Sequence, residues 1–356
     1  MSNQLKYLFT VFIVYLSTTM TASAGSMAYN HAPIGVMGDH LHKKGELMFS
    51  YRYMDMDMEG NRIGTNSASP RQIVSTIPNQ FSGTSGQPPT LRVVPTSMRM
   101  EMHMFGAMYA PTDDITLMIM GTYNEREMDH VTFQGAQGTT VLGNFTTRSS
   151  GFGDTKVTGL IRLYDDGKHK LHLNAGVSIP TGSITENDRI LTPMGATTTV
   201  RLPYPMQLGS GTWDLEPGIT YNGFSSNWGW GAQARSSLRL GDNSENYSLG
   251  DRYEVSAWFA YLFSDSVSTS LRIKGTTQGN IDGRDAQIIG PVQTAQTEFQ
   301  GGDRVDLLGG INLLVTSGLF KGHRFALETG FPIHQDLHGP QLETDFLLTA
   351  GWQKIF

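Results

Sequence analysis

Residues 171–179 read LHLNAGVSI, with apolar residues at the odd positions and small or polar ones at the even positions. The same alternation recurs at 253–263 (YEVSAWFAYLF) and 267–274 (VSTSLRIK). A period of two predicts β-strands, each with one apolar and one more polar face. In a soluble sandwich the apolar face packs into a core, whereas in an outer-membrane barrel it meets lipid and the other face meets the lumen.

Strand number and loop length decide between these two folds. Twelve segments have strand character: 46–58, 97–110, 114–128, 154–164, 169–180, 212–221, 227–240, 252–263, 267–277, 304–315, 323–332 and 341–356. The connections alternate between short and longer, including long ones at 59–96, 129–153, 181–211 and 278–303. We therefore predict an all-β fold, a transmembrane antiparallel up-and-down β-barrel of about 12 strands, with short periplasmic turns and long extracellular loops.

The two ends of the chain indicate how it reaches the membrane. Lys6, an apolar run at 7–16 and the small residues 21–24 predict a signal peptide over 1–24. Residues 25–44 are then a periplasmic N-terminal segment, expected as a plug or metal-binding stretch, and 45–356 form the barrel. The final strand ends in Phe356, a pattern typical of substrates of the barrel assembly machinery, although Lys354 interrupts its alternation. We expect the bacterial outer membrane, with its lipid as a partner and both termini in the periplasm.

Composition excludes several other classes of protein. Charged residues make up 16% of the chain, cysteine is absent, and the formal net charge is −6. A nucleic-acid surface is not expected at this charge. The sequence also has no G-x-S-x-G elbow, H-E-x-x-H motif or phosphate-binding loop, so we do not expect an enzyme.

A family resemblance rests on residues 149–154 (SSGFGD), the strand that follows, and Ile179-Pro180-Thr181-Gly182-Ser183. This region resembles the barrel family labelled putative MetA-pathway of phenol degradation. The resemblance extends over about residue 45 to the C-terminus, with its specific motifs at 149–183. It implies an outer-membrane barrel that moves small molecules, and it carries over no catalytic residues.

Methionine is concentrated in the first three expected strands, where twelve of the eighteen lie between positions 48 and 128. All twelve occupy even positions, opposite an aromatic and aliphatic face. If that apolar face meets lipid, the methionines line the lumen. An antiparallel register with an index sum near 156 would place Met54 opposite Met102, Met56 opposite Met100 and Met58 opposite Met98.

Two interpretations of this methionine face stay open. Thioethers are soft ligands that suit Cu(I), and this part of the chain resembles Met-rich copper-resistance barrels in composition. They also make an adaptable apolar surface that packs or passes apolar solutes. The candidate metal-contacting residues are Met54, Met56, Met58, Met98, Met100, Met102, Met104, Met120, Met128 and His130 in the barrel, and His31, Met37, His40 and His42 before it.

The function expected from sequence is a channel or transporter for small solutes, with Cu(I) or Cu(II) handling through a methionine-lined lumen. Its cargo would then be a metal ion or a small molecule. The alternatives are a conduit for hydrophobic or aromatic compounds, and a structural or adhesive barrel that acts through its extracellular loops.

Overall fold

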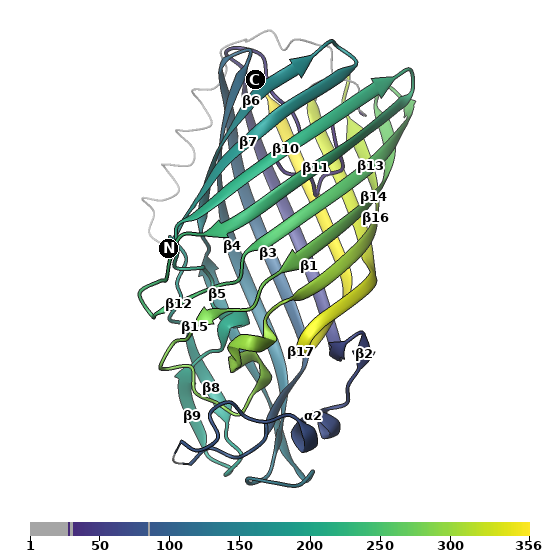
Figure 1. The fold of residues 1–356 in the computed structure, drawn as a ribbon. Helices are drawn as coiled ribbons and strands as arrows, with labels where there is room; N and C mark the ends of the chain where they lie inside the picture. Colours follow the sequence, from purple (N-terminus) through teal and green to yellow (C-terminus); the bar gives the residue numbers. More distant parts are fainter. Residues whose placement is uncertain (1–27, 29–30, 85) are drawn as a thin grey trace, which may run out of the picture.

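The computed structural model describes residues 28, 31–84 and 86–356, so the expected signal peptide lies outside the described residues. Eleven strand elements form one closed antiparallel ring (Figure 1). In ring order they are β1 (Leu47–Gly64), β3 (Val93–Thr112), β4 (Ile115–Phe133), β6 (Thr155–Asp165), β7 (His169–Ile179), β10 (Asp214–Ser225), β11 (Trp228–Arg239), β13 (Arg252–Ser264), β14 (Val267–Gln278), β16 (Gly302–Leu314) and β17 (His323–Ile355). The expected transmembrane-type barrel fold is confirmed.

The last element, β17, passes along the wall twice. Residues 324–337 pair with β16, whereas residues 337–355 pair with β1. An odd number of elements cannot close a ring of purely antiparallel pairs, so β17 must reverse its direction. The reversal lies beside Gly339, whose φ of +73° falls in the left-handed region that glycine adopts most readily. The eleven elements therefore make the twelve passes expected from the sequence.

The prediction that residues 129–153 form an unpaired loop is wrong. β4 continues to Phe133, and β5 (Val141–Phe152) pairs with it. β5 and β6 lie in succession along β4 with almost the same register, separated only by Gly153 and Asp154. The Gly, Ser and Thr residues of this stretch weaken the alternation of apolar and polar positions, so the sequence does not indicate the strand. β1, β3, β4 and β5 consequently form a taller part of the wall.

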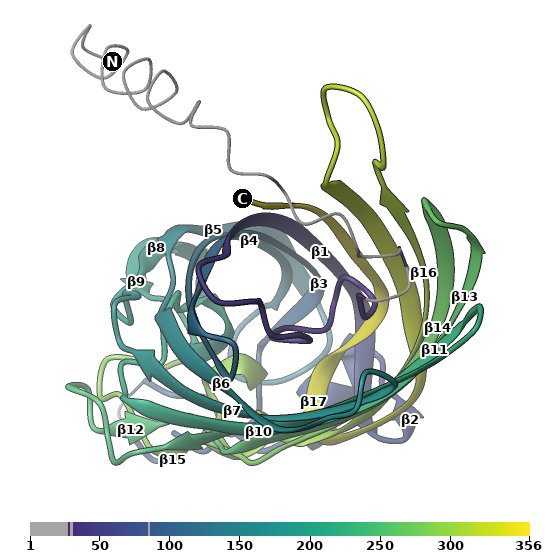
Figure 2. The same ribbon diagram turned by 90° about the horizontal axis from the view of Figure 1, so that it is seen from above.

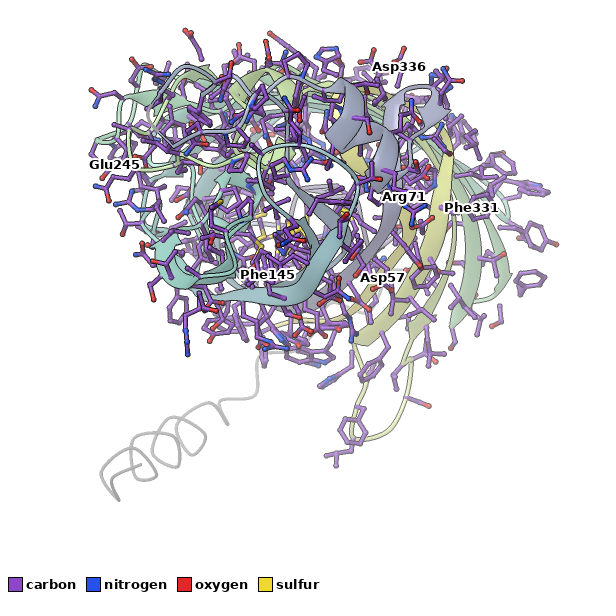
Figure 3. The ribbon with its side chains drawn as sticks, turned by 90° about the horizontal axis from the view of Figure 1, so that it is seen from below. Asp57, Arg71, Phe145, Glu245, Phe331 and Asp336 are labelled. Atoms are coloured by element: carbon purple, nitrogen blue, oxygen red, sulfur yellow. The ribbon has the colours of Figure 1, made fainter. Side chains whose placement is uncertain are left out.

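The predicted register of the methionine strands is confirmed. Met54, Met56 and Met58 of β1 pair with Met102, Met100 and Met98 of β3. The opposite face points outward, where Phe105, Leu117 and Ile119 are about half exposed. Figure 3 shows sulfur atoms gathered inside the ring while Phe331 points away from it.

The ring has two different rims. Short turns connect the strands at one end, the turn rim, and the long connections gather at the other, the loop rim (Figure 1). The loop rim carries β2 (Asn66–Ser67), α2 (Pro70–Thr76), β8 (Asn187–Leu191), β9 (Thr197–Arg201), η2 (Tyr204–Met206), β12 (Tyr247–Ser248), β15 (Asp282–Gly283), η3 (Gln293–Ala295) and η4 (Thr297–Phe299).

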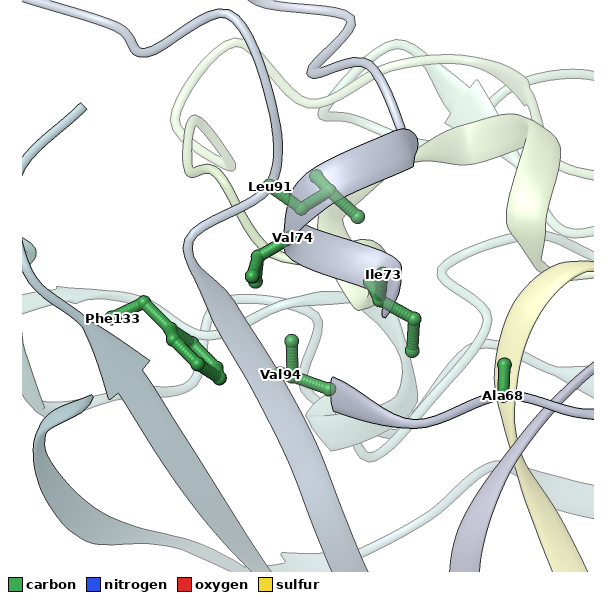
Figure 4. Packing of buried hydrophobic residues seen from close by; sticks show 6 residues of the cluster. All are labelled: Ala68, Ile73, Val74, Leu91, Val94 and Phe133. Carbon is green, nitrogen blue, oxygen red and sulfur yellow. The ribbon is translucent and has the colours of Figure 1, made fainter. Parts of the chain in front are cut away.

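A small apolar core fixes the 65–92 connection over the loop rim. The helix α2 begins after Ser69, whose hydroxyl accepts the Gln72 N–H, and Pro70 occupies its first turn. Its Ile73 and Val74 are buried in a cluster with Ala68, Leu91, Val94 and Phe133 (Figure 4).

Among the described residues no helix has the length and apolar character needed to cross a membrane.

The chain before the barrel lies inside it. Figure 2, a view down the barrel from above, shows the purple N-terminal segment, residues 31–46, crossing the interior. Ala32, Ile34 and Val36 are almost completely buried. Because residues 31–44 belong to no strand of the sheet, their backbone groups need other partners from the wall.

Candidate functional site: the lumen and its two closures

The lumen contains a cavity of about 640 Å³ with two chemically different walls. One wall belongs to β1, β3 and β4 and is rich in thioethers. We call it the methionine wall: Met54, Met58, Met98, Met100, Met102, Met104, Met120 and Met128. The other wall belongs to β6, β10, β11, β13 and β14 and is charged. We call it the ion-pair wall: Lys156, Asp214, Glu216, Arg235, Arg239, Arg252, Glu254, Arg272 and Lys274.

The methionine wall packs against a segment that enters from the loop rim. Met98 and Met128 form a buried cluster with Leu202 and Met206 of the 181–211 connection, and Met58, Met100 and Leu342 pack at its edge. Met56 has a polar contact instead, because its sulfur accepts a hydrogen bond from the Arg304 guanidinium at 3.9 Å. The sequence-predicted methionines therefore lie on one inner surface, and part of that surface is in apolar contact.

The ion-pair wall is largely neutralised by its own partners. Arg272 donates two hydrogen bonds of 2.8 Å to Glu328. Lys274 lies 3.0 Å from Asp306. Further ion pairs join Lys156 and Arg235 to Glu216, and Arg239 to Asp214. Charges paired in this way hold neighbouring strands together and leave the cavity wall polar but close to neutral.

Residues 201–208, the partition segment, separate the lumen from the loop rim. Arg126 donates to the carbonyls of Pro205 and Gln207, and the Ser149 hydroxyl donates to that of Met206. From the other side, Arg201 lies 2.6 Å from the fully buried carboxylate of Asp285. The partition segment is thus tied to both the barrel wall and the 279–301 connection.

A second cavity lies on the far side of the partition segment. This loop-rim pocket has a volume of about 500 Å³ and is lined mainly by apolar residues of the loops, including Ile190, Val200, Leu202, Ile288 and Pro291. Leu202 lines this pocket and also packs in the methionine cluster, so the partition segment lies between the two spaces. The size falls within the range of small-molecule sites.

His130 lines this loop-rim pocket, although it shares strand β4 with Met128. Its ring stacks on Phe145 with centroids 4.6 Å apart, and its Nδ1 has no hydrogen-bond partner. The structure therefore places this predicted candidate outside the lumen cavity.

Polar side chains of the wall hold the N-terminal segment near the turn rim. Arg52 donates to the Ile34 carbonyl, Gln233 to that of Met37, and His172 to that of Gly38. Met37 lines the lumen cavity. These donors come from strands around the ring, so the segment is bound on several sides.

Three of the predicted histidines meet in this segment. The rings of His31 and His40 have centroids 4.7 Å apart, and those of His40 and His42 are 4.8 Å apart. Burial and the charge of Arg324 hold the pKa of His31 well below its ordinary value. Burial tends to raise the pKa of Asp39, but the adjacent His40 outweighs it and the pKa lies below the usual range. These surroundings favour the neutral form of the His31 ring and the ionised form of the Asp39 carboxylate.

Several functional contacts were not predicted. Asp39 joins the histidine cluster, and its position next to His40 is the signal that could have identified it. The Arg201–Asp285 ion pair joins two loops 84 positions apart, and no local pattern in the sequence indicates it. Asp154 accepts from the backbone N–H groups of Gly182 and Ser210, which ties together the two ends of the 181–211 connection.

The comparisons with known proteins identify the fold. Neither a family model nor a curated protein matches the chain, so the resemblance at residues 149–183 stays a prediction. An outer-membrane channel from Pseudomonas putida F1 matches with a TM-score of 0.56 at 12% identity, covering 91% of this chain and 100% of that one. The Pseudomonas putida toluene transporter TodX (TM-score 0.44, 9% identity, 88% and 90% coverage) and a Pseudomonas aeruginosa FadL homologue (0.41, 9%, 87% and 90%) also match. Scores below 0.5 add nothing to the assignment. The first match shows that the chain has the fold of an outer-membrane channel.

Proposed function

We propose that this protein is an outer-membrane channel that admits small hydrophobic compounds, aromatic ones among them, from its loop rim. The observation that carries the proposal is the loop-rim pocket, an apolar space of about 500 Å³ formed by loops over a channel-type barrel. A polar solute would gain little from such a lining. A hydrophobic solute is transferred from water to an apolar surface at each contact.

The partition segment lies on the route that we propose from the pocket to the lumen. Leu202 contacts the loop-rim pocket on one side and the methionine wall on the other. A solute that displaces the partition segment therefore meets flexible thioethers next, and methionine adapts well to apolar solutes of different shape. The ion-pair wall opposite would keep water in the lumen and prevent the solute from binding too tightly.

The test measures uptake of the fluorescent aromatic amine N-phenyl-1-naphthylamine by Gram-negative cells that produce the barrel. Val200→Trp narrows the loop-rim pocket and is expected to reduce the initial uptake rate several-fold. Thr199→Trp is the matched control, because Thr199 is the next residue of β9, is exposed and does not line the pocket. The proposal is wrong if cells with folded wild-type barrel take up the probe no faster than cells without it, or if both variants behave alike.

A second cargo, Cu(I), is favoured by one specific observation. The register places three methionine pairs of β1 and β3 directly opposite each other, where cross-strand side chains are about 4.5–5.5 Å apart. Against copper stands the apolar packing of Met98 and Met128 with Leu202. Anaerobic Cu(I) titration against a competing chelator separates the two cargoes, using wild type and a variant with Met→Leu at 54, 56, 100 and 102. We expect equal weak binding and unchanged amine uptake, whereas tight stoichiometric binding lost in the variant would establish the copper function.

A further inference from the structure

Four buried side-chain nitrogens of the N-terminal segment have no hydrogen-bond partner, and their histidines lie outside the loop-rim pocket where the proposed hydrophobic route begins. His31 is 5% exposed and His42 is 3% exposed. Nδ1 of His31, both ring nitrogens of His40 and Nε2 of His42 have no hydrogen-bond partner. Burying a polar group without a partner costs free energy, so such a cluster requires an explanation.

The ligand atoms of three residues face a common point. One ligand atom each from His31, Asp39 and His40 lies within 4.8 Å of the other two. The His40 Nδ1 lies 2.9 Å from Asp39 Oδ1, although the two do not have hydrogen-bond geometry. Two ligands on one tetrahedral ion with bonds of about 2.0–2.1 Å are separated by roughly 3.3 Å. The separations in the structure, from 2.9 Å to at most 4.8 Å, span that value.

We propose that His31, Asp39 and His40 bind one divalent transition-metal ion of the Zn²⁺ or Cu²⁺ type. Imidazole and carboxylate are the ligand set that these ions favour, whereas Mg²⁺ and Ca²⁺ favour oxygen alone. The fourth position is taken by water or by Nε2 of His42, whose ring adjoins that of His40.

The surrounding contacts orient the proposed ligands. The second carboxylate oxygen of Asp39 accepts the Ala32 N–H at 3.0 Å, which leaves the first oxygen for the ion. His42 Nδ1 lies 3.4 Å from Glu46, and its backbone N–H donates to Thr116. Partners of this kind fix ligand orientation in metal sites. The positive charge of Arg324 nearby opposes a cation, but that side chain is bound to the Ala32 carbonyl and to Asn312.

The site would act as a clip on the N-terminal segment. An ion held by residues 31 and 40 closes a loop within this segment, and that loop includes Ile34 and Gly38, whose carbonyls are bound by the wall. Binding that occurs only in the folded segment stabilises that fold by mass action. Occupancy would therefore keep the segment in the lumen, and loss of the ion would favour its release.

Metal binding is tested with tag-free, detergent-folded barrel and Zn²⁺ in competition with a chromophoric chelator. We expect one site per chain, weakened at least tenfold by His31→Ala and by His40→Gln. His103→Gln is the matched control, since His103 lies on the outer face beside Tyr51 and should leave Zn²⁺ affinity unchanged. Unchanged Zn²⁺ affinity in folded His31→Ala and His40→Gln, or a wild-type affinity no higher than that of a variant carrying both substitutions, would overturn the proposal.

Two further measurements remain decisive if a variant fails to fold. Wild-type barrel loaded with one equivalent of Cu²⁺ should give an electron paramagnetic resonance spectrum with coupling to two imidazole nitrogens, or to three if His42 takes the fourth position, and a spectrum with oxygen ligands alone contradicts the site. The chain has no cysteine, so Ile34→Cys supplies a single buried thiol in the segment. Zn²⁺ should slow its maleimide labelling severalfold, and an unchanged labelling rate contradicts the clip. Because neither readout involves a hydrophobic solute, this inference and the proposed channel function can fail separately.

Discussion

The carboxylate of Glu328 accepts the backbone N–H of Gly35 at 3.0 Å, although the two residues lie 293 positions apart. The same carboxylate accepts two hydrogen bonds from Arg272. A buried ion pair of the barrel wall is therefore also an anchor for the N-terminal segment, so wall stability and lumen closure depend on one side chain.

Glu328→Ala should destabilise the barrel strongly. It leaves the Arg272 guanidinium, 4% exposed, without its carboxylate, and removing one partner of a buried pair costs about 3–5 kcal/mol. Urea unfolding followed by tryptophan fluorescence measures the change. The control is Glu127→Ala, whose ion pair with Arg148 is well exposed and should contribute nothing measurable. Similar midpoints for the two variants would contradict the anchoring role.

Gly35→Val should expel the N-terminal segment while the barrel stays folded. A side chain at this position would collide with the Glu328 carboxylate and the Arg272 guanidinium. Faster maleimide labelling of the Ile34→Cys thiol, by an order of magnitude, is the expected result. Gly121→Val in β4 is the control, because a Cβ there has nothing within 4 Å. Equal labelling rates would mean that the segment tolerates the added bulk.

Asp285→Asn should loosen the partition segment. The buried Asp285 carboxylate pairs with Arg201, and its backbone N–H donates to the Tyr204 hydroxyl. With the charge removed, we expect faster uptake of N-phenyl-1-naphthylamine and larger single-channel current in planar bilayers, both by severalfold. Asp282→Asn alters an exposed carboxylate of the same connection and should change neither quantity. A decrease in both readouts would show that the ion pair supports the route rather than closing it.

Acidification should release the N-terminal segment in the presence of a chelator. Burial lowers the pKa of His31, with Arg324 adding to the effect, and burial also lowers that of His42, opposed by Glu46. Once released, each imidazole titrates near 6.5, so below that pH the released form binds more protons than the docked form. The docked state is thus fully stabilised above about pH 7 and loses stability as the pH falls.

Hydrogen exchange, corrected for intrinsic rates, measures this pH effect. The amides of residues 31–42 should exchange faster at pH 5 than at pH 7.5, and those of β7 should not change. Asp39 and His40 face His31 within the same cluster. Slower or equal exchange of the segment at pH 5 would contradict a docked state that depends on neutral histidines.

The local alternation of apolar and polar residues determined most strands of this protein and the two faces of each. Alternation with period two specifies which residues share a strand face, because successive side chains point to opposite sides. The shared face of the even-numbered methionines followed from that rule, whereas their pairing across β1 and β3 needed an assumed register, which the structure confirms. Strand β5 was missed because its Gly, Ser and Thr residues carry little hydrophobic contrast.

Tertiary structure alone decided what fills the barrel. Binding of residues 31–46 depends on donors such as Arg52, His172 and Gln233, which lie on different strands of the ring. The partition segment depends on an ion pair between two loops, and the reversal of β17 depends on pairing with both β16 and β1. The sequence by itself therefore determined the wall of the barrel and its faces, since these follow from neighbours along the strand. The contents of the lumen were decided only by contacts between residues far apart in the chain, for which no local period exists.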